Sequence, residues 1–291
     1  MELSNIFVPA IVSVITALIT VSYKSSRDRK NYEEKLKLDH SLSEQRKIKE
    51  SIAKYKVHMI NACEELSNRF KSLMLVHEKK WHHVNGNYLS DDRYYFNSFV
   101  YRFASVIWWS NKVEMELVYL DTTVAEREDL DFIKFCKKFS SILCQAKLFK
   151  GLDYDDSKET DHFFKHKLIS QASKLNDNNS FIVEYSAYEN DLSQYIKGMK
   201  GICKFIDGIS PNEERYRWAR IYCMQLLNAA FLNTYGYDFQ QIDGQMIQEI
   251  VTSISGCNNG DIILNNFIEL IKDYKLNENH EVSKLINTIN A

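Results

Sequence analysis

Residues 48–73 read IKESIAKYKVHMINACEELSNRFKSL, and this stretch decides the fold class. Its apolar side chains recur at steps of 4, 3, 4, 4, 3, 4 and 3 residues. That spacing places them on one face of an α-helix, and the face is wide enough to pack against other helices. We therefore predict a long helix whose buried face is formed by Ile48, Ile52, Tyr55, Met59, Cys63, Leu66, Phe70 and Leu73.

The composition extends this prediction to the whole chain, because the 291 residues include only 9 Gly and 2 Pro. Sandwiches and doubly wound sheets need frequent turns, and turns consume these two residue types. The glycines form neither a G-x-G-x-x-G nor a G-x-x-x-x-G-K motif, which excludes the usual dinucleotide and P-loop sites. We predict an all-α protein with further helices at 90–121, 125–149, 161–175, 187–206, 211–235, 239–255 and 261–274, then a short C-terminal one. Ser210 and Pro211 form the clearest helix start.

The first helix carries a predicted transmembrane segment. Residues 3–23 contain no charged side chain, and about twenty apolar residues suffice to cross the hydrocarbon core of a bilayer. A signal peptide does not fit, because no Lys or Arg precedes the segment and no A-x-A cleavage site follows it. The positive-inside rule then places the N-terminus outside and the bulk of the chain in the cytoplasm. The deciding cations are Lys24, Arg27, Arg29 and Lys30.

Small and hydroxyl side chains share one stripe of this segment. At 3.6 residues per turn, the stripe comprises Ala10, Ser13, Thr16, Ala17 and Thr20. In lipid, small residues let two helices approach closely, so the stripe predicts self-association, with a narrow oligomeric pore as a special case. The alternative is that each hydroxyl simply bonds to the backbone of its own helix.

Charge divides the chain behind this segment. Residues 24–82 hold 15 Lys and Arg against 9 Asp and Glu, whereas residues 83–291 hold 22 against 29. Basic side chains beside a bilayer attract anionic headgroups, so we expect anionic lipids rather than nucleic acid as the partner of the basic cluster. The expected organisation is a transmembrane anchor at 1–23, a basic helical stalk at 24–47 and a cytoplasmic helical domain at 48–291.

No set of residues indicates a catalytic centre. The six cysteines include no C-x-x-C pair, which predicts buried free thiols in a reducing compartment. His162 and His166 are four residues apart but lack a third ligand and a glutamate base, so we expect exposed histidines. The acidic run at 153–161 lacks the glycine of a calcium loop and indicates a solvated loop. We expect no cofactor and no metal, and we favour a non-enzymatic protein over an enzyme.

Several short segments resemble a group of uncharacterised bacterial proteins. Members of this group have one N-terminal membrane helix, a charged helical stalk and an all-α cytoplasmic body, and genes of this architecture accompany phage-defence loci. The resemblance implies a place at the bacterial inner membrane and transfers no catalytic residue. It is carried by Lys54-Tyr55, Ala62, Glu64-Glu65-Leu66, Asn68-Arg69-Phe70, and an aromatic helix around Tyr101, Phe103 and Trp108-Trp109.

Three functional hypotheses follow. The favoured one is a membrane-anchored, oligomeric helical protein that acts at the bacterial inner membrane as a component of antiphage defence. The first alternative is a membrane-tethered ribonuclease of the HEPN class, which carries a closely spaced Arg and His on one helix; here Arg69 and His77 have seven residues between them, outside that pattern. The second alternative is a passive anchor that recruits an operon-encoded partner protein.

Overall fold

The computed structural model describes the backbone of residues 3–90, 93–177 and 181–291, and their side chains except those of residues 3–11 and Val14. Within this part of the chain every regular element is a helix, and the only β pairing is an isolated bridge between Asn176 and Ile182. The predicted all-α class is therefore confirmed. The α-helices are α1 (Leu3–Val76), α2 (Tyr94–Leu117), α3 (Arg127–Cys144), α4 (Lys165–Ala172), α5 (Tyr185–Asn190), α6 (Leu192–Gly198), α7 (Lys200–Ile206), α8 (Arg217–Tyr235), α9 (Gly244–Ser255), α10 (Gly260–Lys272) and α11 (His280–Asn290).

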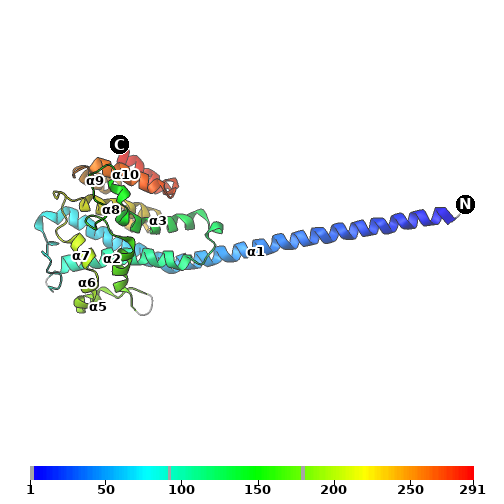
Figure 1. Ribbon diagram of the computed structural model, residues 1–291, viewed down its shortest axis with the longest axis horizontal. Coiled ribbons are helices and arrows are strands. Elements are labelled where there is room, and N and C mark those ends of the chain that lie inside the picture. The colour runs from blue at the N-terminus through cyan, green and yellow to red at the C-terminus, as the bar shows by residue number, and fades with distance from the viewer. Residues whose placement is uncertain (1–2, 91–92, 178–180) are drawn as a thin grey trace.

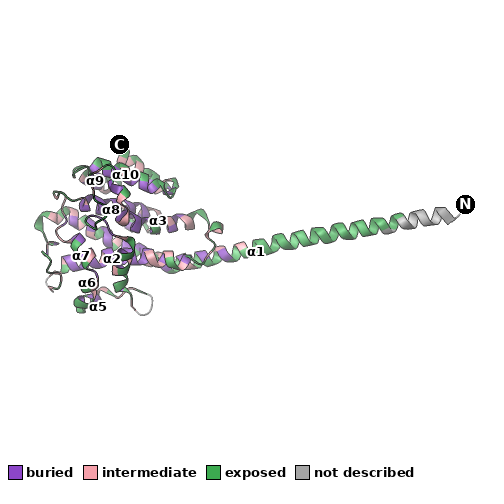
Figure 2. Ribbon diagram, in the orientation of Figure 1, coloured by how far each residue is buried: buried purple, intermediate pink, exposed green. Residues whose placement is uncertain are grey.

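Helix α1 is one continuous helix of 74 residues that projects far beyond the body (Figure 1). Its described side chains are exposed up to residue 40, and burial begins at Glu44 and Ile48 (Figure 2). From there, all eight apolar residues of the predicted stripe are buried against the body. The apolar face at 48–73 thus holds the body to one end of α1, while the other end extends without contact to it.

The described part of the chain contains no helix that is both long enough and apolar enough to cross a membrane. Much of the predicted anchor at 1–23 falls on residues 1–11 and Val14, whose side chains lie outside the described residues. The side chain of Ala10 in the predicted stripe is among these.

Helix α8 is the centre of the body. It is buried from Arg217 through Leu232 and packs against α1, α3, α9, α10 and α11. Polar side chains of α8 bond to α1 inside this core: the Tyr222 hydroxyl donates to the carbonyl of Phe70 at 3.0 Å, and the Asn228 amide donates to that of Cys63 at 2.8 Å. Helix α2 packs along α1 and α3, so α2 and α8 both contact these two helices.

Several predicted helix bounds differ from the observed ones: the helix expected at 161–175 is α4 and begins at Lys165, and the one expected at 239–255 is α9 and begins at Gly244. The stretch 187–206 forms three short helices, α5 to α7, with breaks at Asp191 and Met199. The Gln171 side chain of α4 accepts the backbone N–H of Ile202 at 3.0 Å in the first turn of α7. The helix start at Ser210 is wrong by six residues. Helix α8 begins at Arg217, and the preceding Tyr216 donates its N–H to the carboxylate of Asp161 at 3.0 Å.

Candidate functional site

A cavity of about 900 Å³ lies where α2, α3 and the N-terminus of α4 meet. Tyr274, which follows α10, also lines it. Pockets for small molecules commonly have volumes of about 300–1,000 Å³, so this cavity is large enough for a ligand.

Two polar atoms in the wall of this cavity are buried without a hydrogen-bond partner among the described residues. They are Oε1 of Glu114, on α2, and Oγ of Ser141, on α3. The other oxygen of Glu114 accepts from Nζ of Lys165 at 3.2 Å. Leaving a buried polar atom unpaired costs about 1–3 kcal/mol, and proteins keep few such atoms. Both atoms are closed to solvent, so they are a cost to the fold in this wall and are not open to the cavity itself.

Two lysines and a histidine lie at the opening of the cavity. Lys137, Lys165 and His166 line it and are exposed to solvent. Lys165 and His166 are the first two residues of α4, a helix whose N-terminus has no side-chain cap. The carboxylate of Glu159 already lies at this N-terminus, where it accepts the N–H of Phe164 at 2.9 Å and complements the positive end of the helix dipole.

Lys138 is a buried cation next to this cavity. Its Nζ lies 4.0 Å from the centre of the Tyr274 ring and has no hydrogen-bond partner among the described residues. Burial lowers the pKa of Lys138 from 10.5 to about 8. The amine is thus still largely protonated at neutral pH, where the face of the Tyr274 ring and the nearby charge of Asp273 offset part of its lost hydration.

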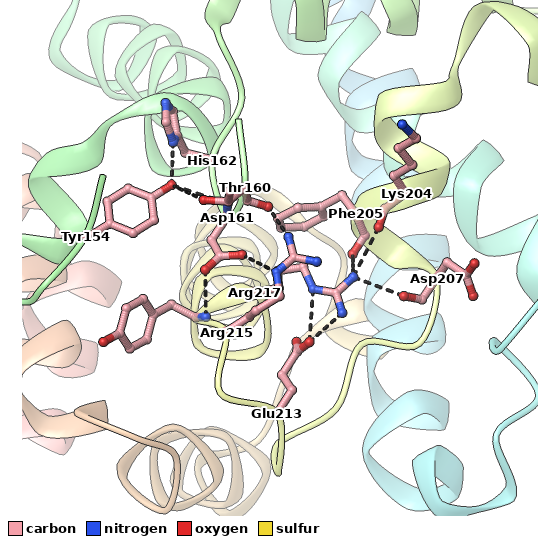
Figure 3. A network of polar contacts seen from close by, with 11 residues as sticks. Tyr154, Thr160, Asp161, His162, Lys204, Phe205, Asp207, Glu213, Arg215 and Arg217 are labelled. Carbon is pink, nitrogen blue, oxygen red and sulfur yellow. Dashed lines mark hydrogen bonds and ion pairs between the residues drawn. The ribbon is translucent and has the colours of Figure 1, made fainter. Parts of the chain in front are cut away.

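A second polar cluster joins the loop before α4 to the start of α8 (Figure 3). Asp161 accepts from Nε of Arg215 at 2.7 Å, and the Tyr154 hydroxyl lies 2.5 Å from Nδ1 of His162. The expectation of an exposed His162 is wrong: it is 4% exposed, and burial, with the nearby charge of Arg220, lowers its pKa. His166 is exposed, and the two histidines do not share a helix.

Arg217 closes the C-terminal end of α7 in the same cluster (Figure 3). One of its guanidinium nitrogens, Nη1, donates to the backbone carbonyls of Lys204, Phe205 and Asp207 at 3.1, 2.8 and 3.0 Å. The other side of the guanidinium pairs with Glu213. All of these partners belong to the chain itself, so Arg217 joins elements of the fold and is not free to hold a ligand.

Arg220 has the same kind of role at the end of α3. Its guanidinium is fully buried, donates to the carbonyls of Ile142 and Gln145, and lies 4.2 Å from the centre of the Phe149 ring. Desolvation lowers the pKa of Arg220 to about 10. The last carbonyls of a helix have no partner within the helix, and here a buried cation satisfies them.

A smaller cavity of about 420 Å³ lies beside this cluster. Phe163 lines both cavities, and the smaller one is bordered by Lys200, Lys204 and Arg215. Its carboxylate, Glu159, is already engaged by Nζ of Lys167 at 2.6 Å and by the N–H of Phe164 at 2.9 Å. The smaller cavity therefore lacks the unpaired buried acceptor found in the larger one.

Neither thiol nor metal chemistry is indicated. The described residues contain no group of three or more His, Cys, Asp or Glu side chains that could hold a metal ion. Burial raises the pKa of all six cysteines, to about 11 even for the half-buried Cys257. These thiols are protonated at neutral pH and are poor nucleophiles.

The site residues expected from the sequence lie on α1, far from the cavities. Ser13, Thr16, Ala17 and Thr20 are exposed. The hydroxyls of Thr16 and Thr20 donate to the carbonyls four residues earlier, each at 2.8 Å. The basic cluster is exposed, and only Arg29 pairs within the described residues, with Glu33 at 3.5 Å.

The residues of the ribonuclease alternative have separate packing partners. The Arg69 guanidinium lies 4.5 Å from the centre of the Tyr95 ring. The ring of His77 packs edge-on against Trp218, and its Nδ1 lies 3.1 Å from the carbonyl of Met74.

Sequence reasoning missed Glu114, Lys138 and Ser141. A signal for them exists in the helical spacing. Lys138 lies three residues after the buried Phe135, and Ser141 lies three residues after Lys138. These polar residues occupy positions where the period of the helix calls for apolar ones.

Comparison with known proteins does not assign the chain to a family. No family model matches the chain, and neither a curated protein nor a solved structure matches it.

Proposed function

We propose that this protein is a membrane-anchored helical protein that oligomerises at the bacterial inner membrane, in the setting of antiphage defence. The observation that carries the proposal is the free end of α1, where apolar side chains have no partner. Five of them are 50–66% exposed: Val12, Ile15, Leu18, Ile19 and Val21.

The exposed apolar surface is too large to be left in water. Burying a Val, Leu or Ile side chain completely is worth about 1.5–3 kcal/mol, so these five partly exposed side chains represent roughly 5–9 kcal/mol. No part of the body reaches them, since the described side chains of α1 are exposed up to residue 40. Burial of these side chains in lipid, or against the same segment of another copy, would gain this free energy.

The basic cluster supports lipid as that environment. Lys24 and Arg27 begin directly after the apolar stretch, and Arg29 and Lys30 follow within the next two turns. Each Lys or Arg near an anionic bilayer contributes about 1 kcal/mol of attraction. From Tyr23 to Glu44, where burial starts, α1 rises about 30 Å, so the body would be held at that distance from the membrane.

Oligomerisation through the small-residue stripe is part of the same proposal. Because the hydroxyls of Thr16 and Thr20 bond to their own helix, close packing of small side chains would drive association rather than hydrogen bonds across the interface. The place in phage defence rests on the resemblance carried by residues 54–70 and the aromatic helix. The separate packing partners of Arg69 and His77 make a non-enzymatic role preferable to the ribonuclease alternative.

Membrane fractionation of the full chain tests the anchor. We expect the protein to remain in the membrane pellet after carbonate extraction, and the double variant Ile15→Lys/Leu18→Lys to move to the supernatant. The matched control is Leu36→Lys/Leu38→Lys, which adds the same charges to exposed positions of the stalk and should stay in the pellet. Release of the unaltered protein by carbonate would refute the proposal.

Native mass measurement in detergent tests the oligomer. We expect more than one copy per particle, and a lower average mass for the triple variant Ser13→Leu/Ala17→Leu/Thr20→Leu. The control Ile15→Leu/Ile19→Leu changes large side chains outside the stripe and should leave the mass unchanged. A monomer for the unaltered chain would remove self-association but leave the anchor standing.

A further inference from the structure

The smaller cavity, of about 420 Å³, is lined by a buried histidine that has one unpaired ring nitrogen. His162 is 4% exposed, and its Nδ1 lies 2.5 Å from the Tyr154 hydroxyl. Its Nε2 has no hydrogen-bond partner among the described residues, and it is not one of the buried atoms that solvent cannot reach. In this it differs from the unpaired Nδ1 of His82, which is sealed from solvent. A molecule in the cavity can therefore bond to Nε2 of His162.

The Tyr154 hydroxyl makes this ring nitrogen a donor. The hydroxyl oxygen accepts the N–H of Asp161 at 3.3 Å and the Thr160 hydroxyl at 3.4 Å, so its own proton is directed to Nδ1 of His162. Burial, with the nearby charge of Arg220, lowers the pKa of His162 and keeps the ring neutral at pH 7. A neutral ring whose Nδ1 accepts carries its proton on Nε2. Figure 3 shows the second ring nitrogen on the side of the ring that faces away from Tyr154.

Three cations border the same cavity. Lys200 and Lys204 lie one turn apart on α7, are exposed, and form no ion pair with a described residue. Arg215 is held in place by Asp161, which accepts from its Nε at 2.7 Å, and by the carbonyl of Thr160, which accepts from its Nη2. The Nη1 of Arg215 has no partner among the described residues, so one edge of the guanidinium remains free to donate.

The acceptors in the wall of this cavity are already used. One oxygen of Glu159 accepts from Lys167, and the other accepts the N–H of Phe164. The Oε1 of Gln171 accepts the N–H of Ile202, while its amide nitrogen has no partner among the described residues. The side chains left free in this wall are therefore donors, and three of them are positively charged. A ligand that fits them must bring several acceptor oxygens and negative charge.

We propose that this cavity binds a phosphate group, either free phosphate or the phosphate of a small phosphomonoester. A carboxylate has two oxygens and one charge, whereas a phosphate group offers at least three terminal oxygens and up to two negative charges to donors on several sides. The Nε2–H of His162 and the free edge of Arg215 donate to these oxygens, and the two lysines of α7 offset the charge.

The remaining wall of the cavity fits the organic part of an ester. Phe163 and Phe205 are both buried and both line the cavity. Their rings lie 4.8 Å apart between centres, so they form one apolar surface. The inference goes beyond the anchoring function and does not depend on it, because residues of the body alone form this cavity.

Calorimetric titration of the full chain, in a nonionic detergent at neutral pH and constant ionic strength, tests the proposal. The probes are inorganic phosphate, phenyl phosphate and acetate. We expect inorganic phosphate or phenyl phosphate to bind with a Kd below about 1 mM, and acetate to bind at least about tenfold more weakly. Tighter binding of phenyl phosphate assigns the site to an ester, and equal or tighter binding of inorganic phosphate assigns it to the free ion.

Two variants of His162 separate its donor from its packing. His162→Asn places an amide near the position of Nδ1 and removes the group at Nε2, whereas His162→Gln places its amide near Nε2. We expect about tenfold weaker binding of the better probe by His162→Asn, and a smaller loss in His162→Gln. Lys200→Ala/Lys204→Ala changes exposed side chains and should fold normally, but it should bind at least about tenfold more weakly.

The matched control is Lys137→Ala/Lys150→Ala, which removes two exposed lysines outside this cavity and should bind as the unaltered chain does. Equal weakening in both double lysine variants would show an effect of net charge alone and would overturn the proposal. So would the failure of inorganic phosphate and phenyl phosphate to bind, equal binding of acetate, or undiminished binding by a folded His162→Asn. Circular dichroism reports folding, and the two double lysine variants decide the question if neither His162 variant folds.

Discussion

Replacing Lys138 with methionine should make the protein more stable at neutral pH. The side chain is fully buried on α3, its Nζ has no hydrogen-bond partner among the described residues, and the face of Tyr274 is its nearest compensation. Methionine has nearly the same length and no charge, so Lys138→Met removes the desolvation while keeping most of the packing.

The magnitude follows from the pKa. Burial lowers the pKa of Lys138 from 10.5 to about 8, so between these values the unfolded chain binds more protons than the folded one. Stability of the unaltered protein therefore rises with pH across this window, and the full penalty is present below pH 8. At 1.36 kcal/mol per unit, the penalty is about 3 kcal/mol at pH 7 and falls to about 1.5 kcal/mol at pH 9.5.

Urea unfolding of the full chain at both pH values measures this difference. The adjacent Lys137→Met is the control, because Lys137 is exposed and its removal should change the free energy of unfolding by less than about 0.5 kcal/mol. The reasoning is refuted if Lys138→Met is less stable than the unaltered protein at pH 7. It is also refuted if the gap between them does not narrow by pH 9.5.

Three further changes are measured by urea unfolding or NMR. Gly260→Ala should lower the free energy of unfolding by about 3 kcal/mol or more, because a Cβ there would lie 1.8 Å from the carbonyl oxygen of Ile254. Gly244→Ala, which has open space around it, should raise the free energy of unfolding by about 0.5 kcal/mol. Asp207→Ala should lower the free energy of unfolding by about 3 kcal/mol, since the carboxylate of Asp207 accepts the N–H groups of residues 84–86 at 2.9–3.2 Å. An equal loss in Asp207→Asn, which keeps one acceptor, would contradict this. Burial lowers the pKa of His82 to about 4, so its ring should stay neutral in an NMR titration until near that pH, and stability should fall as pH drops from 6.5 to 4; titration near 6.5 would contradict this.

The long first helix was predictable because one signal governs it. From Ile48 to Leu73 the apolar period, the absence of glycine and proline and the polar opposite face all favour the same helix, and the burial of the stripe follows. No tertiary contact overrides a helix signal that is consistent over so many turns.

Helix starts at the centre of the body were not predictable, because distant residues set them. Ser210 and Pro211 carry a strong local start signal, yet α8 begins only after Tyr216, whose N–H bonds to Asp161, 55 positions earlier in the chain. The same applies to α7, where Gln171 reaches across from α4 and would meet any Cβ at Gly201 at 2.6 Å. The local sequence can indicate a capping residue next to a helix start, but it cannot indicate a hydrogen-bond partner from a distant part of the chain.

The candidate site was missed for a different reason. Apolar periodicity assigns faces of a helix to the interior, and a polar residue on such a face is easily taken for an interruption of the pattern. Lys138 and Ser141 both interrupt the apolar face of α3, and Glu114 lies one turn after Ser110, whose hydroxyl contacts Met59 of α1. Folding keeps these residues inside in spite of their polarity, since their neighbours at steps of three and four are held there. A polar residue that the helical period places in the core therefore either finds partners for all its polar atoms, as Gln225 of α8 does, or leaves one of them unpaired, as Glu114 and Ser141 do.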